Sequence, residues 1–220
     1  MVQAGAELIE WRADFFKDLS SKQSVFEILK KLRKIITDLP LIFTIRTKRE
    51  GGQIEIADSD YSALLLFVSQ TKLADLIDVE LFRCEGCISD LVEKIHEYNM
   101  QVIVSSHDFQ STPSTDELIA RMRLMQTVGG DILKIAVMPT SSKDVLTLSS
   151  ATVEMASETD KPLVTMSMGK LGVISRISGE IFNSSLSFGT VGKGSAPGQI
   201  AIDQLKQCLE IIHTSQSISQ

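Results

Sequence analysis

The sequence lacks several features that would each indicate a particular class of protein. It has only three cysteines, an odd and small number for a disulfide framework, and we expect them to remain thiols in a reducing cytosol. Its longest apolar stretches, such as residues 64–68, are too short to cross a bilayer, and no signal-type segment opens the chain. These absences favour a cytoplasmic protein without a membrane partner.

The sequence also lacks a clustered basic face. It has 22 Lys and Arg residues against 28 Asp and Glu residues, which gives a formal net charge of −6. A nucleic-acid partner needs clustered positive charge to meet its phosphates, and no such Lys/Arg cluster stands out. We therefore expect no nucleic-acid partner.

What the sequence does contain is a regular succession of short β-rich runs. They are Leu8–Ala13, Leu41–Thr47, Leu76–Phe82, Gln101–Ser106, Asp131–Val137, Leu163–Met168 and Leu186–Val191. Their starts lie about 25 to 35 residues apart, the length of one βα unit. Ser24 with Glu27 and Ser114 with Glu117 have the spacing of capping boxes, which predicts helices between the runs, and residues 129–130 are glycines that predict a helix end.

The faces of these predicted strands separate two α/β architectures. In a doubly wound sheet, helices cover both faces and both are apolar. Here one face of each of five strands carries polar side chains: Glu10 and Arg12, Thr44 and Arg46, Asp78 and Glu80, Ser105 and His107, and Lys134. We therefore predict one parallel (β/α) barrel domain over residues 1–220, with its site at the carboxyl ends of the strands. A buried ion-pair layer is the less favoured alternative, because desolvating so many charges is costly.

Lys134 is the strongest candidate nucleophile. It stands between Leu133 and Ile135 in a strand otherwise suited to burial. Burial and the positive charges of Arg12 and Arg46 favour a neutral amine, which can form an imine with a ketone. The alternative is a solvated cation at the rim of the barrel.

His107 is the candidate proton-transfer group. It ends the strand before that of Lys134, and an imidazole can take up and return a proton near neutral pH. The consecutive residues Ser106, His107 and Asp108 do not indicate a hydrolase triad, because neighbouring strand residues point to opposite faces.

Two local patterns carry weaker signals. Cys84 and Cys87 form a C-x-x-C pair, but neither Cys208 nor His96 lies at a familiar zinc-ligand spacing, so packing thiols are favoured over a metal or redox role. Residues 189–195 read GTVGKGS, which lacks the Ser or Thr that a phosphate-binding loop needs after its lysine. The glycines of residues 194–199 suit either a mobile flap or a plain connecting loop.

Six motifs, in order, resemble the type I 3-dehydroquinate dehydratases. They are EWRADF, TIRTKREGG, DVELF, SSHDF, LKIAVMP and the run from TMSMGKLGVISR to SAPGQ. Together they cover almost the whole chain. The resemblance implies an α/β fold, the (β/α)8 TIM-type barrel. With only seven strands predicted and nine residues before Glu10, we expect the first βα unit to be missing from this chain.

The resemblance also implies a chemistry and a set of site residues. The reaction is dehydration of 3-dehydroquinate to 3-dehydroshikimate in the shikimate pathway, by a homodimer without cofactor or metal. Lys134 matches the Schiff-base lysine, His107 the general acid and base, and Glu50 the carboxylate that orients this histidine. Arg176 matches the residue that grips the substrate carboxylate, and Phe188 matches an apolar wall. The remaining matches are substrate hydroxyl and carboxylate contacts: Glu10, Arg12, Arg46, Ser195 and Gln199.

Two other functions remain open. A class I aldolase on the same barrel would use the same imine, but it predicts phosphate-binding loops after the last two strands, which are not evident here. A truncated, catalytically inactive relative would bind the ligand without turnover.

Overall fold

The computed structural model describes residues 4–83, 86–192 and 194–217. The described residues form two compact units, each with its own strands and helices. We call residues 7–106 and 125–131 the N-terminal unit, and residues 1–6, 107–124 and 132–220 the C-terminal unit.

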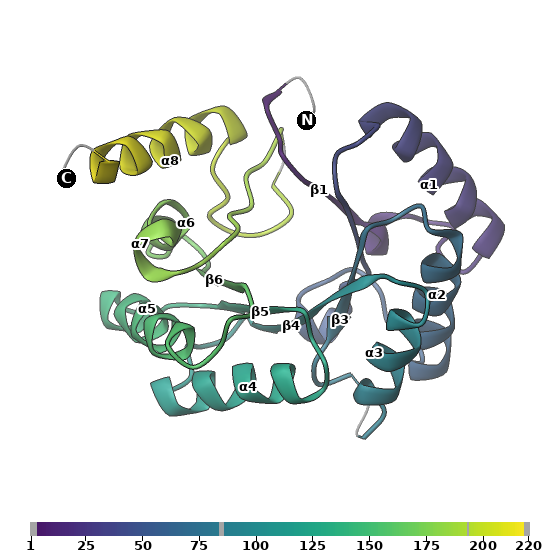
Figure 1. The fold of residues 1–220 in the computed structure, drawn as a ribbon, viewed down its shortest axis with the longest axis horizontal. Helices are drawn as coiled ribbons and strands as arrows, with labels where there is room; N and C mark the ends of the chain where they lie inside the picture. Colours follow the sequence, from purple (N-terminus) through teal and green to yellow (C-terminus); the bar gives the residue numbers. More distant parts are fainter. Residues whose placement is uncertain (1–3, 84–85, 193, 218–220) are drawn as a thin grey trace. The chain divides into compact units, whose positions relative to one another are not determined.

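The N-terminal unit is built on parallel strands in chain order (Figure 1). These are β1 (Ile9–Arg12), β2 (Leu41–Thr44), β3 (Leu76–Glu80) and β4 (Gln101–Asp108), whose last two residues belong to the other unit. The helices are α1 (Lys22–Ile36), α2 (Asp58–Thr71) and α3 (Ile88–His96), with short 3-10 helices η2 (Ala13–Phe15) and η3 (Lys48–Glu50). α2 packs against both α1 and α3, so the three helices form one layer along the strands.

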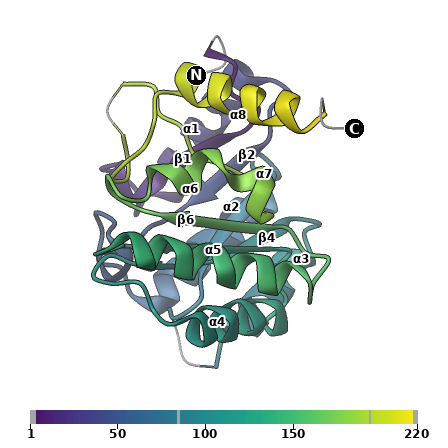
Figure 2. The same cartoon turned by 90° about the vertical axis from the view of Figure 1, so that its left-hand side faces the viewer.

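The C-terminal unit contains β5 (Ile132–Val137) and β6 (Leu163–Ser167), which pair in parallel. Its helices are α5 (Ser142–Ala156), α6 (Val173–Ile177), α7 (Gly179–Phe182) and α8 (Ile202–Ser217), while α4 (Thr115–Thr127) begins here and ends in the other unit. α5 and α6 pack on β6, and α6 also contacts α8 (Figure 2). Alternate residues of the two strands, Ala136, Val164 and Met166, join Met168 in one apolar cluster.

Side-chain caps fix where the helices begin. Ser114 Oγ accepts the backbone N–H of Glu117 at 3.3 Å, so the predicted start of α4 is confirmed. The prediction for α1 is wrong by one turn, because Ser21 is the N-cap and its Oγ accepts the N–H of Ser24 at 3.2 Å. Ser24 therefore lies inside the helix rather than at its start.

The predicted seventh strand, Leu186–Val191, does not form. The segment around it makes only single bridges, Leu163 with Ser184 and Thr190 with Ala201, and a strand needs a succession of such pairs. Six strands are therefore present among the described residues, where the sequence predicted seven. The β-rich composition of this segment is used in a loop.

Two of the three cysteines, Cys87 and Cys208, lie among the described residues. Cys87 is disulfide-bonded and Cys208 is a free thiol, which corrects the expectation that every cysteine stays reduced. That expectation rested on the cell compartment and not on the distance between sulfur atoms; Cys84 lies outside the described residues.

None of the described helices has the length and apolar character needed to cross a membrane.

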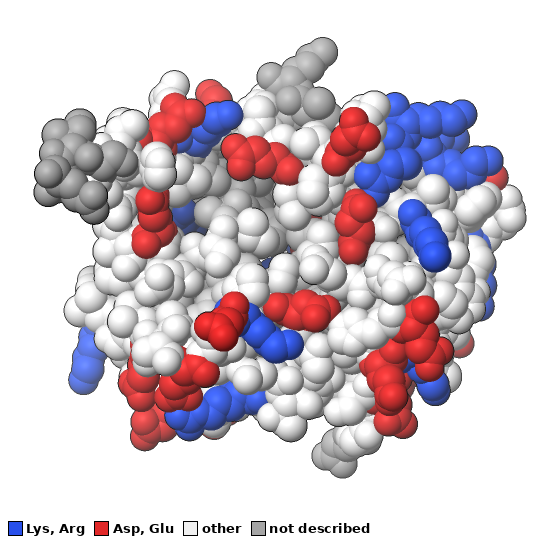
Figure 3. Space-filling view, in the orientation of Figure 1, with Lys and Arg blue, Asp and Glu red and all other residues white. Residues whose placement is uncertain are grey.

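Basic side chains gather on one helix. Figure 3 shows Lys and Arg residues clustered where α1 lies in Figure 1, and the exposed members include Lys30, Lys31 and Lys34. Arg33, on the same helix, instead donates to the Leu73 carbonyl and to Asp75. The expectation of no Lys/Arg cluster therefore fails for α1, within a chain whose net charge is negative.

Replacing the cap of α1 tests where this helix begins. We expect Ser21→Ala to lower the free energy of unfolding by about 1 kcal/mol, because the N–H of Ser24 loses its acceptor. Ser24→Ala, inside the helix, is the matched control and should change stability much less. Urea denaturation measures both, and an equal or larger loss for Ser24→Ala would contradict this assignment.

Candidate active site

Lys134 is buried in the C-terminal unit. It lies in the middle of β5 and is 4% exposed. Its Nζ lies 4.6 Å from the centre of the Phe188 ring, and Phe188 packs against the apolar cluster of β5 and β6. The alternative of a solvated lysine at a barrel rim is therefore wrong. An amine held against an aromatic face and shielded from water suits attack on a carbonyl carbon.

His107 lies at the end of β4. The loop that follows β4 is hydrogen-bonded to the residue after β5. The Asp108 carboxylate accepts the N–H groups of Gln110 and Ser111, both at 2.9 Å. The Ser111 carbonyl in turn accepts the N–H of Met138 at 3.2 Å, just beyond β5. Asp108 thus binds the backbone of its own loop, and this loop in turn is hydrogen-bonded to the residue that follows β5.

Arg176 is a buried cation that pairs with no carboxylate among the described residues. It lies in α6 and is 2% exposed, and burial lowers the pKa of its guanidinium. Nη2 donates to the Pro197 carbonyl at 3.1 Å and Nη1 contacts Met166 Sδ at 3.9 Å, whereas Nε has no acceptor among the described residues. Buried charges are normally paired, so this guanidinium is suited to an anion from outside the chain.

Ser195 and Gln199 contact each other in the loop before α8. The side-chain oxygen of Gln199 accepts the N–H groups of Ser195 at 2.7 Å and Ala196 at 3.3 Å. The loop also contacts Gly169, which lies just beyond β6. The N–H of Gly169 donates to the Pro197 carbonyl at 3.2 Å. This loop is therefore tied at two points, and its predicted role as a flap stays a prediction.

In the N-terminal unit, Arg46 lies at the centre of an ionic cluster. It is 3% exposed, and Nη1 donates to Glu50 at 3.2 Å, Glu80 at 3.1 Å and Ser105 at 3.0 Å, while Nη2 donates to Asp78 at 2.8 Å. Burial lowers the pKa of Arg46, but the nearby carboxylates raise it by more, so the net pKa lies well above its usual value. The less favoured alternative, a buried ion-pair layer, is what the structure shows at this position.

Tyr61 and Gly52 lie against this ionic cluster. Tyr61, on α2, accepts the N–H of Glu80 on its hydroxyl oxygen at 3.0 Å, and burial followed by the charges of Glu80 and Asp78 raises the pKa of the phenol. Gly52 approaches the Arg46 backbone so closely that an added Cβ would lie 1.8 Å from the Arg46 carbonyl oxygen. Tyr61 could not be assigned a role from the sequence, because nothing in its helical segment indicates which strand it faces.

Glu10 and Arg12 are also placed in the N-terminal unit. Glu10 Oε1 accepts the Thr44 hydroxyl at 2.9 Å, which confirms that these two residues of β1 and β2 share one polar face. Arg12 pairs with Asp14, a residue of the EWRADF motif that the sequence argument did not single out. Its signal was its position two residues after an arginine already assigned to the site.

The predicted site residues thus form two groups, each described within its own unit. Lys134, His107, Arg176, Phe188, Ser195 and Gln199 belong to the C-terminal unit, and Glu10, Arg12, Arg46 and Glu50 belong to the N-terminal unit. The predicted pairing of Glu50 with His107 stays a prediction. Among the described residues, no group of three or more His, Cys, Asp or Glu side chains is arranged to hold a metal ion.

Comparison with known proteins identifies relatives along nearly the whole chain. Over 213 residues the chain is 47% identical to the 3-dehydroquinate dehydratase of Klebsiella pneumoniae (strain 342), covering 96% of this chain and 85% of that protein. Two solved structures are also similar. The type I enzyme from Clostridium difficile has a TM-score of 0.92 at 46% identity, covering 96% of this chain and 84% of that one. The enzyme from Geobacillus kaustophilus has a TM-score of 0.94 at 39% identity, covering 97% and 83%.

The family model agrees with these relatives. The model described as type I 3-dehydroquinase matches residues 1–216. The α/β fold with six parallel strands is thus shared with solved members of this family. The chain therefore belongs to the type I 3-dehydroquinase family of 3-dehydroquinate dehydratases, which are hydro-lyases.

Proposed function

We propose that this chain dehydrates 3-dehydroquinate to 3-dehydroshikimate through an imine on Lys134. The observation that carries the proposal is the buried Lys134 amine against the Phe188 ring. The same unit holds Arg176, a buried guanidinium with no carboxylate partner among the described residues. An amine for a ketone and a guanidinium for a carboxylate are the two groups that recognise a keto acid.

The proposed reaction begins with covalent binding. The Lys134 amine adds to the ketone carbon and water leaves, which produces an iminium ion. The iminium draws electrons from the adjacent carbon, so His107 can remove a proton there and form an enamine. No free carbanion has to exist, because the nitrogen accepts the electron pair.

Elimination and release complete the cycle. The enamine electrons expel the hydroxyl group on the next carbon, and His107 returns its proton so that the group leaves as water. A further water hydrolyses the imine and frees both product and Lys134, so one water is lost overall. Each proton transfer by a positioned imidazole contributes about 10²- to 10⁴-fold in rate.

The other residues hold the reactants in this proposal. Arg176 binds the substrate carboxylate, and Phe188 forms an apolar wall beside the imine. Glu50 orients His107. The hydroxyl and carboxylate oxygens of the substrate are held by Glu10, Arg12, Arg46, Ser195 and Gln199. None of these steps requires a cofactor, and we expect the active form to be a cytoplasmic homodimer.

One similar structure supports this proposal over its alternatives. The structure of the Clostridium difficile relative contains covalently modified comenic acid, which supports covalent chemistry on a small acid in this family. The chain is also similar to a 3-hexulose-6-phosphate synthase, but at 12% identity and a TM-score of 0.58 that likeness concerns the fold alone. An inactive binding protein differs from the proposal in one measurable respect, since it binds 3-dehydroquinate without releasing product.

Chemical trapping tests the imine. With 3-dehydroquinate present, we expect borohydride to leave one reduced, ligand-sized adduct on Lys134, found by mass spectrometry of the digested protein. Lys134→Ala should give neither adduct nor turnover, whereas Lys170→Ala, which removes an exposed lysine of the same unit, should give both. Full activity of Lys134→Ala, or an adduct elsewhere, would refute the imine mechanism.

Replacing the histidine separates imine formation from proton transfer. We expect His107→Ala to retain the borohydride adduct and to lose at least about 10²-fold in kcat, because one proton acceptor and donor is removed. Single-turnover measurements with trapping at each time point give both quantities. Turnover within threefold of wild type would remove the role assigned to His107.

Arg176 should show a conflict between stability and binding. Because burial lowers the pKa of Arg176 and no carboxylate compensates its charge among the described residues, Arg176→Met should leave the free energy of unfolding unchanged or raise it by up to about 2 kcal/mol. The same change should raise KM at least about tenfold, since one charge-assisted contact is lost. Arg123→Met, which removes an exposed arginine of the same unit that pairs with Glu158, is the control and should leave KM unchanged.

A further inference from the structure

Asp14 is a fully buried carboxylate directly after the first strand. It lies in η2, the 3-10 helix that follows β1, and its side chain is 0% exposed. A buried carboxylate is costly unless each oxygen accepts hydrogen bonds. The partners of Asp14 therefore show what its burial accomplishes.

The first partner is the Arg12 side chain. Arg12 Nε donates to Asp14 Oδ1 at 2.8 Å, and Arg12 Nη2 donates to Asp14 Oδ2 at 2.9 Å. This two-bond pairing fixes the plane of the guanidinium as well as its position, which a single ion pair would not do.

The second set of partners belongs to the loop after β2. Asp14 Oδ1 also accepts the backbone N–H of Arg46 at 3.3 Å, and Oδ2 accepts the backbone N–H of Gln53 at 3.1 Å. Each carboxylate oxygen thus binds one guanidinium nitrogen and one backbone nitrogen. Asp14 joins the Arg12 side chain to both ends of the segment 46–53, which carries Arg46 and Glu50.

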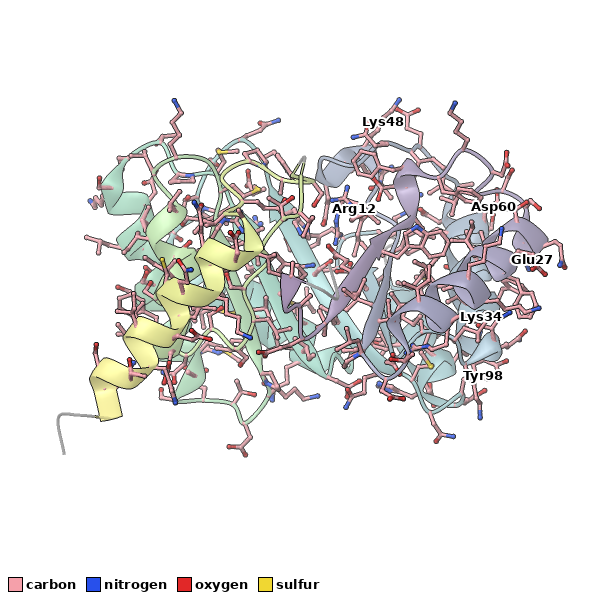
Figure 4. All side chains as sticks on the ribbon, turned by 90° about the horizontal axis from the view of Figure 1, so that it is seen from above. Arg12, Glu27, Lys34, Lys48, Asp60 and Tyr98 are labelled. Atoms are coloured by element: carbon pink, nitrogen blue, oxygen red, sulfur yellow. The ribbon has the colours of Figure 1, made fainter. Side chains whose placement is uncertain are left out.

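The remaining surface of Arg12 is left for a ligand. Its Cζ lies 5.2 Å from the centre of the Phe15 ring, so an aromatic ring covers one face. Nη1, on the edge away from Asp14, has no hydrogen-bond acceptor within the described part of the chain, and the side chain is 15% exposed. Figure 4 shows Arg12 beside the end of β1, in the N-terminal unit.

We propose that Asp14 is a positioning residue. It holds Arg12 so that the Nη1 edge faces a substrate oxygen, and it also fixes the position of the loop that carries Arg46. This inference rests on the proposed function, in which Arg12 and Arg46 bind the substrate. Asp14 itself does not touch substrate in this proposal. Because Asp14 already restrains the Arg12 side chain, Arg12 loses less rotational freedom when the substrate binds.

The test uses Asp14→Asn in the full chain. An amide of the same shape replaces one accepting oxygen by an NH2 group, which faces an Arg12 donor and a backbone donor at once. We expect KM for 3-dehydroquinate to rise at least tenfold, while kcat stays within threefold of wild type. Steady-state kinetics gives both, and thermal unfolding records how much of the protein stays folded.

Asp75→Asn is the matched control. Asp75 Oδ2 accepts Arg33 Nη2 at 2.6 Å and the backbone N–H of Leu41 at 2.7 Å, so it combines an arginine with a backbone donor at the start of β2. Its loss should lower the Tm without changing KM. A KM for Asp14→Asn that equals that of Asp75→Asn would reduce Asp14 to a structural residue and overturn the inference.

A double-mutant cycle tests whether Asp14 acts through Arg12. In an Arg12→Met background, Asp14→Asn should raise KM by less than threefold further, because the group that it positions is already gone. A full tenfold rise in that background would overturn the proposed route. Wild-type protein that fails to convert 3-dehydroquinate would refute the proposed function itself, whereas an active wild type with a normal Asp14→Asn refutes only this inference.

A measurement on the wild type covers the case in which Asp14→Asn does not fold. In ¹⁵N-labelled protein, the Arg12 Nε–H should exchange slowly with solvent both without and with 3-dehydroquinate, since Asp14 accepts it in either state. Rapid exchange of that proton in the free, folded protein would overturn the inference.

Discussion

The ionic contact between Arg46 and the carboxylates around it is the constraint on which the polar interior of the N-terminal unit depends. One guanidinium meets Asp78 and Glu80 on β3 and Glu50 in η3. Removing this cation would leave the negative charge of the buried carboxylates uncompensated. That costs far more free energy than replacing the whole cluster by apolar side chains. The contact therefore specifies the register of β2 against β3 as well as the placement of the loop that carries Glu50.

The apolar part of the fold was predictable from the sequence because strand period and helix caps are local signals. Six of the predicted strands form, and β5 places Lys134 between Leu133 and Ile135 as its neighbours imply. The seventh failed because its residues have β-forming composition but gain no continuous partner, and partner availability is a tertiary property. The start of α1 was predicted wrongly for a different reason. Ser24 has the capping-box spacing with Glu27, but Ser21 is also a residue that can cap a helix, and only the folded backbone distinguishes the two.

The candidate site was predictable in its charges but not in their partners. Side-chain parity placed Glu10 with Thr44, and Arg46 with Asp78 and Ser105, on shared faces. Side-chain parity cannot distinguish an arginine with donors left for a ligand from an arginine that is already surrounded by carboxylates, since both side chains point to the same face. Arg46 is surrounded by carboxylates, whereas Arg176 has none among the described residues, and that difference depends on distances that no sequence pattern encodes.

The close approach of Gly52 to the Arg46 carbonyl has a consequence for how tolerance to substitution would be interpreted in this chain. A methyl group at position 52 would displace the main chain of Arg46, since its nearest contacts are the carbonyl group of Arg46, followed by the Arg46 Cβ. In a survey of every single replacement, this glycine would therefore rank with the reactive residues, although it supplies no atom to the chemistry. Intolerance alone marks proximity to a constrained backbone, and a chemical role has to be established separately.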